Sequence, residues 1–177
     1  MAHGRLSKAQ EEAIKPFVNG ITVHDLGAGD LELAEKLLTL GASEVVAIDK
    51  HKMPKSDKIR IVEAYLHNVH EPAKTVFVSW PVNWHDSGLL RFIDHASTVI
   101  YLGTNYDGSA CGFPEMFEHL MKREILKHIP DPKNTLIVYG SRAISRNQVG
   151  EEFAALHQER IYSFEDLYPP WDASGKT

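Results

Sequence analysis

The stretch ITVHDLGAGDLELAEKLL, residues 21–38, contains the transition from a strand to a helix that decides the fold. Its β-branched start predicts a strand over 21–26, and the leucines that follow repeat at helical spacing, which predicts a helix over 31–42. Between the two, Gly27 and Gly29 allow the backbone to turn tightly and to come close to a ligand. The positive N-terminus of the following helix favours an anionic group there.

The same alternation of short apolar runs and amphipathic segments continues along the chain. Further strands are expected at 43–49, 59–64, 74–80, 97–103 and 134–140, and further helices at 6–18, 83–95 and 113–129. Pro16 is expected to end or bend the first of these helices. This order predicts an α/β fold, a three-layer, doubly wound and mostly parallel sheet. Ligands of such sheets bind beyond the carboxyl ends of the strands, near the switch in strand order.

Length and charge restrict the function classes. The 177 residues suit a single domain, 1–177, and a net charge of -5 makes nucleic acid an unlikely partner. One cysteine, Cys111, excludes an internal disulfide framework and a cysteine-rich zinc site. No apolar run approaches the roughly 20 residues that cross a bilayer. The first residues also lack the apolar core of a signal peptide, so we expect a cytoplasmic protein without membrane contact.

Two acids at strand ends narrow the ligand. Asp49 follows Gly29 by twenty residues, a separation at which a carboxylate can accept both hydroxyls of a ribose. Glu32 occupies the last position of the dinucleotide pattern, where its charge would repel a pyrophosphate, and no GxxxxGK[ST] motif is present. Asp25 lies two residues before the first glycine and can receive a protonated amine. S-adenosylmethionine has the ammonium, carboxylate and ribose that these groups would satisfy together.

The segments VHDLGAGDLELA and VVAIDK resemble motif I and the second-strand acid of class I (Rossmann-like) S-adenosylmethionine-dependent methyltransferases. The resemblance covers the core over about 5–140, and its specific part is the first 50 residues. It implies S-adenosylmethionine as the cofactor, with the methionine part near the glycine turn and the ribose at Asp49. The cofactor-binding residues that it implies are Asp25, Gly27, Ala28, Gly29, Asp49, Lys50, Glu63, Ala64 and Ser79.

The chain departs from that family in two places. Leu31 stands where the family commonly has a third glycine. Ser79-Trp80-Pro81-Val82 stands where methyltransferases of amino groups often have Asn/Asp-Pro-Pro-aromatic, which argues against DNA-adenine-type or glutamine-type N-methylation. Trp80 either contacts the acceptor or packs in the core.

The acceptor side is predicted around the ends of the fourth and fifth strands. Trp80, Pro81 and the loop 104–108, with Asn105 and Tyr106, are the expected substrate-binding residues. The candidates for a general base are His85, Asp86, Asn105, Tyr106 and Asp107, and none of them is assigned. No metal is expected, because His67-x-x-His70 and His85-Asp86 lack a third ligand at a recognisable spacing.

The sequence therefore predicts an S-adenosylmethionine-dependent methyltransferase that acts on a small molecule, or on an acceptor that a partner protein helps to recognise. The alternative is a catalytically inactive Rossmann-like binding module with a regulatory role. The third hypothesis is a nucleotide-dependent oxidoreductase, which Glu32 disfavours. At the C-terminus we expect a helix over 151–158, a reduced or atypical seventh strand from 159–164 in place of the family's usual antiparallel one, and an irregular tail over 168–177.

Overall fold

The structure is a computed structural model of the chain and describes residues 5–81, 85–104, 111–131 and 134–143. The helices are α1 (Lys8–Val18), α2 (Glu32–Thr39), α3 (Ser87–His95) and α4 (Pro114–Leu120), with a 3₁₀ turn η1 (Leu66–Asn68). The strands are β1 (Thr22–Leu26), β2 (Glu44–Asp49), β3 (Arg60–Glu63), β4 (Thr75–Ser79), β5 (Thr98–Gly103), β6 (Arg123–Ile129) and β7 (Thr135–Ala143).

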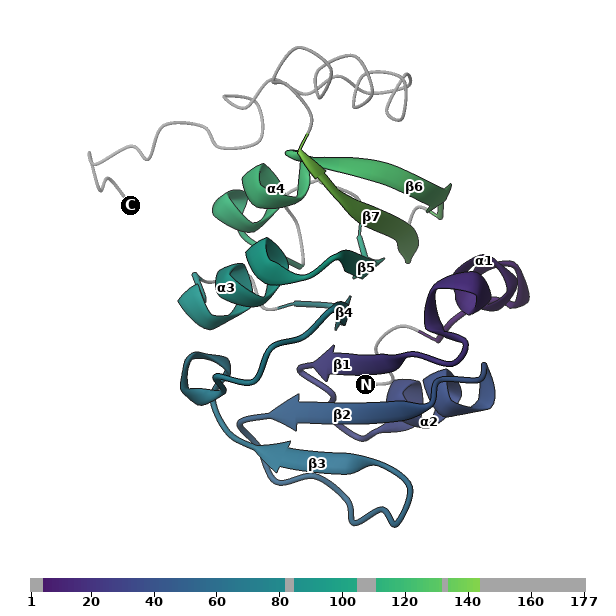
Figure 1. Cartoon of the computed structure of the whole chain (residues 1–177), viewed down its shortest axis with the longest axis vertical. Helices are drawn as coiled ribbons and strands as arrows, with labels where there is room; N and C mark the ends of the chain where they lie inside the picture. Colours follow the sequence, from purple (N-terminus) through teal and green to yellow (C-terminus); the bar gives the residue numbers. More distant parts are fainter. Residues whose placement is uncertain (1–4, 82–84, 105–110, 132–133, 144–177) are drawn as a thin grey trace, which may run out of the picture.

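All seven strands form one sheet in the order β3-β2-β1-β4-β5-β7-β6 (Figure 1). Strands β1 to β5 pair in parallel, whereas β7 is antiparallel to both of its neighbours. The chain builds outward from β1 to β3, then returns to place β4 on the other side of β1. This reversal puts the topological switch point between β1 and β4, where an α/β sheet opens a crevice for a ligand.

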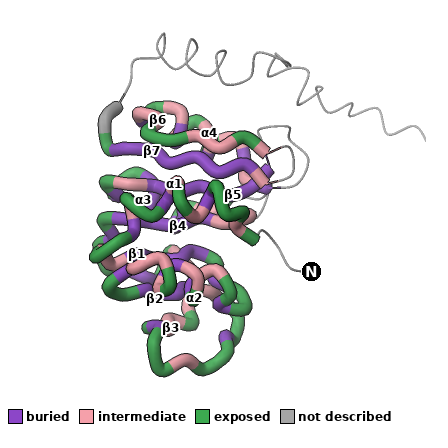
Figure 2. The backbone as a smooth tube through the Cα atoms, turned by 90° about the vertical axis from the view of Figure 1, so that its right-hand side faces the viewer, coloured by how far each residue is buried: buried purple, intermediate pink, exposed green. Residues whose placement is uncertain are grey.

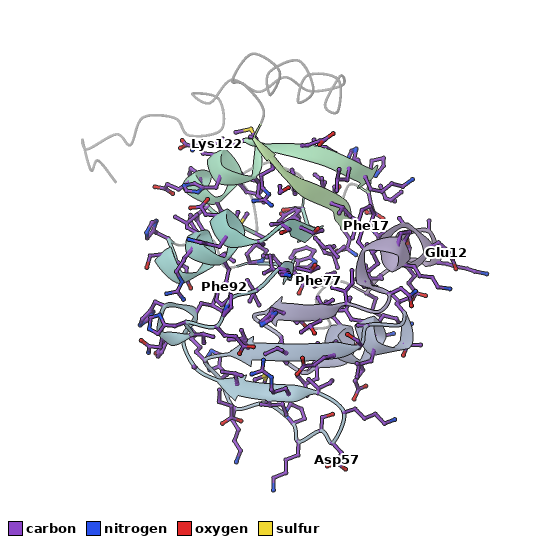
Figure 3. All side chains as sticks on the ribbon, in the orientation of Figure 1. Glu12, Phe17, Asp57, Phe77, Phe92 and Lys122 are labelled. Atoms are coloured by element: carbon purple, nitrogen blue, oxygen red, sulfur yellow. The ribbon has the colours of Figure 1, made fainter. Side chains whose placement is uncertain are left out.

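Helices cover both faces of the sheet, as expected for three layers. On one face α1 and α2 pack on the sheet through Ile14, Val18, Ala34 and Leu37. On the other face α3 and α4 pack through side chains such as Phe92. The strands form the buried centre between these layers (Figure 2), and Phe77 of β4 is completely buried within it. Exposed charged side chains such as Glu12, Asp57 and Lys122 lie at the periphery (Figure 3). The predicted α/β architecture is confirmed.

The helix expected over 113–129 is wrong in its second half. Helix α4 ends at Leu120, and the following residues form β6, which pairs with β7. The register of that pair shifts twice, between Arg123 and Ile125 and between Ile125 and Lys127. Such bulges break the two-residue alternation that identifies a strand, so the apolar residues of β6 imitate a helical spacing.

Within the described residues, the seventh strand of the sheet comes earlier in the chain than the sequence suggested. The segment 134–140, expected as the sixth strand, belongs to β7 and lies between β5 and β6. The atypical end of the sheet is therefore an antiparallel β6–β7 hairpin. The helix expected over 151–158, the strand over 159–164 and the irregular tail over 168–177 lie outside the described residues.

Helix α1 includes Pro16, the proline that was expected to end or bend it. A capping box opens the helix, because the Ser7 and Gln10 side chains each bond the other's backbone N–H group. The helix continues for two residues beyond Pro16 and ends at Val18. Within the part of the chain that is described, no helix combines the length and apolar character needed to cross a membrane.

Candidate functional site

The turn after β1 has a backbone that favours glycine. Gly27 and Gly29 have φ values of 80° and 57°, in the left-handed region where side chains introduce strain. A Cβ atom added at either glycine would meet no atom within 4 Å, so crowding from the protein does not explain their presence. The Gly27 N–H group donates to the Ile48 carbonyl at 2.8 Å, which fixes the turn against β2. The turn is thus open on its outer side.

Leu31 adopts the same left-handed conformation with a φ of 69° at the N-cap of α2. A non-glycine residue there costs about 1–2 kcal/mol. The Leu31 side chain is 2% exposed and packs in the core under α1 and α2. Burial of a leucine stabilises a protein by about 1.5–3 kcal/mol, which offsets the strain. This explains why leucine is tolerated where the sequence comparison pointed to glycine.

Asp49 connects the glycine turn to the end of β2. Its Oδ2 atom accepts a hydrogen bond from the Gly29 N–H group at 3.1 Å, and its Oδ1 atom accepts one from the His51 N–H group at 2.8 Å. These two backbone donors fix the orientation of the carboxylate at the strand end. Lone pairs on both oxygens remain for a further donor, such as a hydroxyl group.

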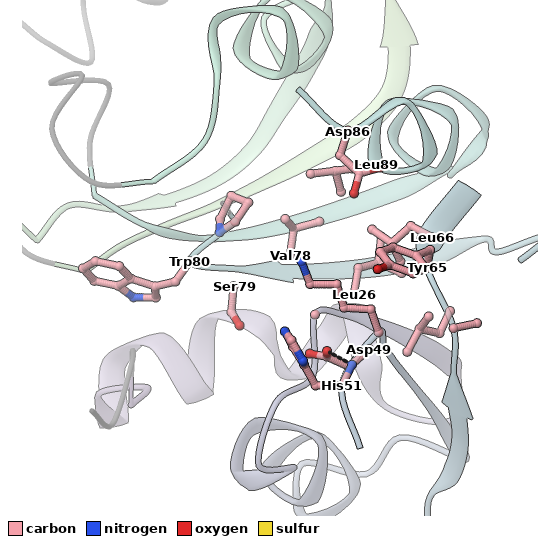
Figure 4. Close-up of a pocket in the computed structure, with 15 residues that line it drawn as sticks. Leu26, Asp49, His51, Tyr65, Leu66, Val78, Ser79, Trp80, Asp86 and Leu89 are labelled. Carbon is pink, nitrogen blue, oxygen red and sulfur yellow. Dashed lines mark hydrogen bonds between the residues drawn. The ribbon is translucent and has the colours of Figure 1, made fainter. Parts of the chain in front are cut away.

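A cavity of about 280 Å³ opens at the carboxyl ends of β1, β2 and β4, at the switch point of the sheet (Figure 4). Asp49 and His51 lie on one side of it, and Asp86 and Leu89 from the α3 side lie across from them. Lys50 is on the rim, where its Nζ atom lies 5.9 Å from the centre of the Tyr65 ring. The cavity therefore combines acidic groups, a cation and apolar walls, which suits a small organic ligand.

Trp80 lies at the mouth of the cavity in an unusual backbone conformation. Its φ is 45°, in the left-handed region that residues other than glycine rarely adopt, and it precedes Pro81. Three hydrogen bonds hold this region. The Trp80 backbone N–H donates to the Leu102 carbonyl at 2.7 Å, and the indole N–H donates to Asn134 Oδ1 at 2.9 Å. Asn134 is in turn bound by Gln10, whose Nε2 atom donates to its carbonyl at 2.6 Å.

The comparison with solved structures agrees with the fold that surrounds this cavity. No protein-family model matches the sequence, and no curated protein matches it either. Among solved structures, a ribosomal protein L11 methylase from Lactobacillus delbrueckii subsp. bulgaricus matches with a TM-score of 0.54 at 20% identity, over 78% of this chain and 80% of that one. A 1,6-didemethyltoxoflavin-N1-methyltransferase from Burkholderia thailandensis, with bound S-adenosylhomocysteine, matches with a TM-score of 0.57 at 14% identity, over 74% and 75%. A magnesium protoporphyrin IX methyltransferase from Synechocystis PCC 6803, with bound S-adenosylmethionine, matches with a TM-score of 0.54 at 12% identity, over 79% and 86%.

The chain has the class I methyltransferase fold. The fold expected from the sequence resemblance is thereby confirmed. In this methyltransferase fold the cavity includes many of the residues expected to bind ligands. Those that line it are Gly27, Asp49, Lys50, Ala64, Ser79, Trp80 and Pro81.

Four of the expected cofactor residues do not line the cavity. Ala28 and Gly29 belong to the turn beside it, and Gly29 acts through its hydrogen bond to Asp49. Glu63 turns toward the β2–β3 loop, where its Oε1 atom accepts from the Met53 N–H group at 3.2 Å. Asp25 is completely buried in β1. The expected acceptor-side residues Asn105, Tyr106 and Asp107 lie outside the described residues.

Asp25 is the electrostatic anomaly of the core. Neither of its carboxylate oxygens has a hydrogen-bond partner among the described residues, although both are buried. Burial is the main cause that raises the pKa of Asp25 to about 7, and the nearby charges of Asp49 and Asp30 contribute to the same increase. A buried acid without a partner is costly to ionise, so a cation bound near it would be favoured.

Several cavity residues were not singled out from the sequence. His51, Tyr65 and Leu66 follow strand ends by two or three residues, so the strand-end rule would have found them if extended a few positions. Leu89 lies inside α3, and only the packing of that helix brings it to the cavity. Within the described ranges, no group of three or more His, Cys, Asp or Glu side chains is placed to hold a metal ion.

Proposed function

We propose that this chain is an S-adenosylmethionine-dependent methyltransferase whose cofactor binds in the cavity at the switch point. The observation that carries the proposal is Asp49, a carboxylate fixed by two backbone N–H groups at the rim of a cavity in a class I methyltransferase fold. An oriented carboxylate at this strand end is suited to the two hydroxyls of a ribose. Two neighbours with this fold contain S-adenosylmethionine or S-adenosylhomocysteine, which supports the same ligand class here.

The residues of the site fit such a cofactor in three further respects. Space outside Gly27 and Gly29 leaves room for a ligand to approach the backbone. Buried Asp25, without a partner among the described residues, favours a positive charge, and the cofactor has both an ammonium and a sulfonium. The apolar side chains of Leu26, Leu66 and Leu89 offer a surface for the adenine ring.

Methyl transfer requires mainly alignment, because the sulfonium supplies an already activated methyl group. In-line positioning of the two reactants is a large source of rate in such reactions. In this chain Ser79, Trp80 and Pro81 line the cavity where β4 ends, so they would orient the acceptor and exclude water. The two hydrogen bonds of Trp80 would keep that wall rigid.

We further propose that the acceptor is a small molecule, with a partner protein as the alternative source of recognition. Within the described ranges, nearly every residue belongs to the sheet, its covering helices or their short connections, so no separate recognition domain is built there. The net charge of -5 also disfavours nucleic acid as the acceptor.

Ligand-dependent melting tests the cofactor assignment. S-adenosylmethionine or S-adenosylhomocysteine at 100 times its dissociation constant should stabilise the fold by about 2.7 kcal/mol, whereas NAD should have no effect. The substitution Asp49→Ala should abolish this stabilisation. Asp57→Ala, which removes an exposed acid from the β2–β3 loop, is the matched control and should retain it. A shift with NAD alone, or an undiminished shift in Asp49→Ala, would overturn the assignment.

An inactive binding module is the second candidate, favoured by the composition of the β4 end. The Trp80 indole N–H is engaged by Asn134, and among the described residues at the end of β4 that line the cavity, Ser79 is the remaining side chain that can exchange a hydrogen bond with an acceptor. Incubation with methyl-labelled S-adenosylmethionine and a panel of amine, hydroxyl and thiol acceptors separates the two functions. Tight cofactor binding with no labelled product across the panel would support the module.

A further inference from the structure

The α3 wall of the cavity places one carboxylate among apolar side chains. Asp86 and Leu89 form this wall, and Leu26, Leu66 and Val78 lie between it and the opposite side (Figure 4). Asp49 and His51 lie on that opposite side. A ribose held at Asp49 would therefore direct its attached base toward the apolar region and Asp86. In an apolar pocket, a single polar group has a large effect on which base is accepted.

The hydrogen bonds of Asp86 leave one of its oxygens for a ligand. As the N-cap of α3, Asp86 uses Oδ1 to accept from the N–H groups of Gly88 at 2.9 Å and Leu89 at 3.1 Å. No donor from the described part of the chain reaches Oδ2. An ionised carboxylate can only accept hydrogen bonds, so its ligand partner must be a donor. The cap fixes the side chain, and this lowers the entropy cost of holding a ligand.

We propose that Asp86 accepts a hydrogen bond from the 6-amino group of the cofactor's adenine and makes the site specific for that base. This inference rests on the proposed function, since it assumes an adenosine cofactor in the cavity. A 6-amino group is a donor and matches Oδ2, whereas a 6-oxo group is an acceptor and would be repelled. Guanine presents a pair of adjacent donors, which requires both carboxylate oxygens, and the cap already uses Oδ1.

Glu63 is the other acid that could have served this purpose, and its contacts argue against it. The sequence resemblance placed Glu63 and Ala64 near the adenine. In the structure the Glu63 side chain accepts from the Met53 N–H group at 3.2 Å, and only Ala64 of the two lines the cavity. The carboxylate that reaches the base is therefore expected to come from α3 and not from β3.

A double-mutant cycle tests the assignment. One axis is Asp86→Asn, which retains an oxygen for the helix cap and replaces the second oxygen by an amide donor. The other axis is S-adenosylhomocysteine against an analogue that carries hydrogen in place of the 6-amino group. Calorimetric titration gives the four dissociation constants. In the wild type, loss of the amino group should weaken binding about tenfold, and in Asp86→Asn it should have less than a twofold effect.

Two additional measurements make the outcome decisive. The 6-oxo analogue of S-adenosylhomocysteine should bind Asp86→Asn more tightly than the wild type, because the amide can donate to the oxo group. Glu63→Gln should retain the tenfold preference for the amino group. An equal loss in the wild type and in Asp86→Asn, or disappearance of the preference in Glu63→Gln, overturns the inference about Asp86. Absence of any S-adenosylhomocysteine binding to the wild type overturns the proposed function instead.

Discussion

The charged side chains at the two ends of the parallel strands differ in the partners that they have within the protein. At the carboxyl ends, Asp25 has no hydrogen-bond partner among the described residues, and Asp49 accepts hydrogen bonds from two backbone N–H groups. At the amino ends, Arg60 forms ion pairs with both Glu44 and Glu71. The acids at the amino ends thus have a cationic partner within the protein, whereas Asp25 and Asp49 form no ion pair among the described residues. Under the proposed function, the amino-end charges stabilise the fold and the carboxyl-end acids serve the cofactor.

A histidine–acid pair, His24 and Glu71, connects the ion pairs at the amino ends of the strands to the core. His24 is buried in β1, with its Nε2 atom 3.5 Å from Glu71 Oε1. Burial lowers the pKa of His24, and Glu71 opposes this effect. The pKa of Glu71 is lowered, chiefly by its hydrogen bond to Arg60. Asp25 is the next residue along the same strand, yet its pKa is raised and no cation is placed beside it within the described residues.

Removing the charge of Asp25 should have the largest effect. Because the pKa of Asp25 is raised from 3.8 to about 7, the folded state binds a proton more tightly than the unfolded state. The stability of the apoprotein should therefore fall as the pH rises between these values, by about 3 kcal/mol from pH 5 to pH 8. In Asp25→Asn this pH-dependent loss should disappear, together with cofactor binding. Urea unfolding at pH 5, 6, 7 and 8 measures the first effect, and titration with S-adenosylhomocysteine measures the second.

Retention of the same pH slope in Asp25→Asn would show that another group titrates there. Asp30→Asn is the matched control, because it removes a nearby acid that is exposed. It should reduce the slope only slightly.

At the amino ends, Arg60→Ala should destabilise the fold by about 1 kcal/mol or less, since exposed ion pairs contribute little. Its guanidinium bonds both Glu44 and Glu71, and the loss should be larger at low salt. The lowered pKa of Glu71 means that this stabilisation is present above the acid's ordinary pKa and is lost as the pH falls through its folded value. Chemical unfolding at pH 7 and pH 4 should therefore show a smaller difference from the wild type at pH 4. An equal difference at both values would exclude the ion pairs as its cause.

The smallest effect is expected for Thr22→Val. The Thr22 Oγ1 atom donates to Glu44 Oε2 at 3.3 Å in an exposed position, and Arg60 already compensates that acid. The loss should be a few tenths of a kcal/mol at most, and the β-propensity of valine should offset part of it. Cofactor affinity should be unchanged. A change in affinity would show that the two ends of the strands are coupled through β1.

The sequence allowed prediction of the parallel half of the fold because each strand there is followed by a distinct signal. Gly27, Gly29 and Asp49 occupy strand ends whose chemistry is visible in their residue types alone. The β6–β7 hairpin lacked such a signal. Its bulges near Ile125 disturbed the alternation of a strand, and pairing with β7, a contact remote from local pattern, decided its conformation.

The acids and glycines of the site could be predicted from the sequence, whereas the apolar residues that form its walls could not. Asp49 could be placed by spacing, and its two backbone donors follow from the turn. Leu89 could not, because its position depends on how α3 packs against the sheet. Asp25 was expected beside a ligand amine, but its complete burial depends on the strands and helices around it. Desolvation of a side chain is a property of the assembled fold, and a local sequence pattern does not predict it.

The hydrogen bonds of Asn134 have a consequence for the order of folding. The Asn134 side chain donates to the Arg5 carbonyl, 129 residues away, and its carbonyl accepts from Gln10, 124 residues away. Its Oδ1 atom accepts from Trp80 at the cavity mouth. Contacts so distant in sequence carry a high loop-closure cost and are expected to form late. During synthesis the contacts of Asn134 with α1 and with Trp80 would thus form only after the residues just before β7 have been added, and a chain without those residues would lack the hydrogen bond between Asn134 and the Trp80 indole.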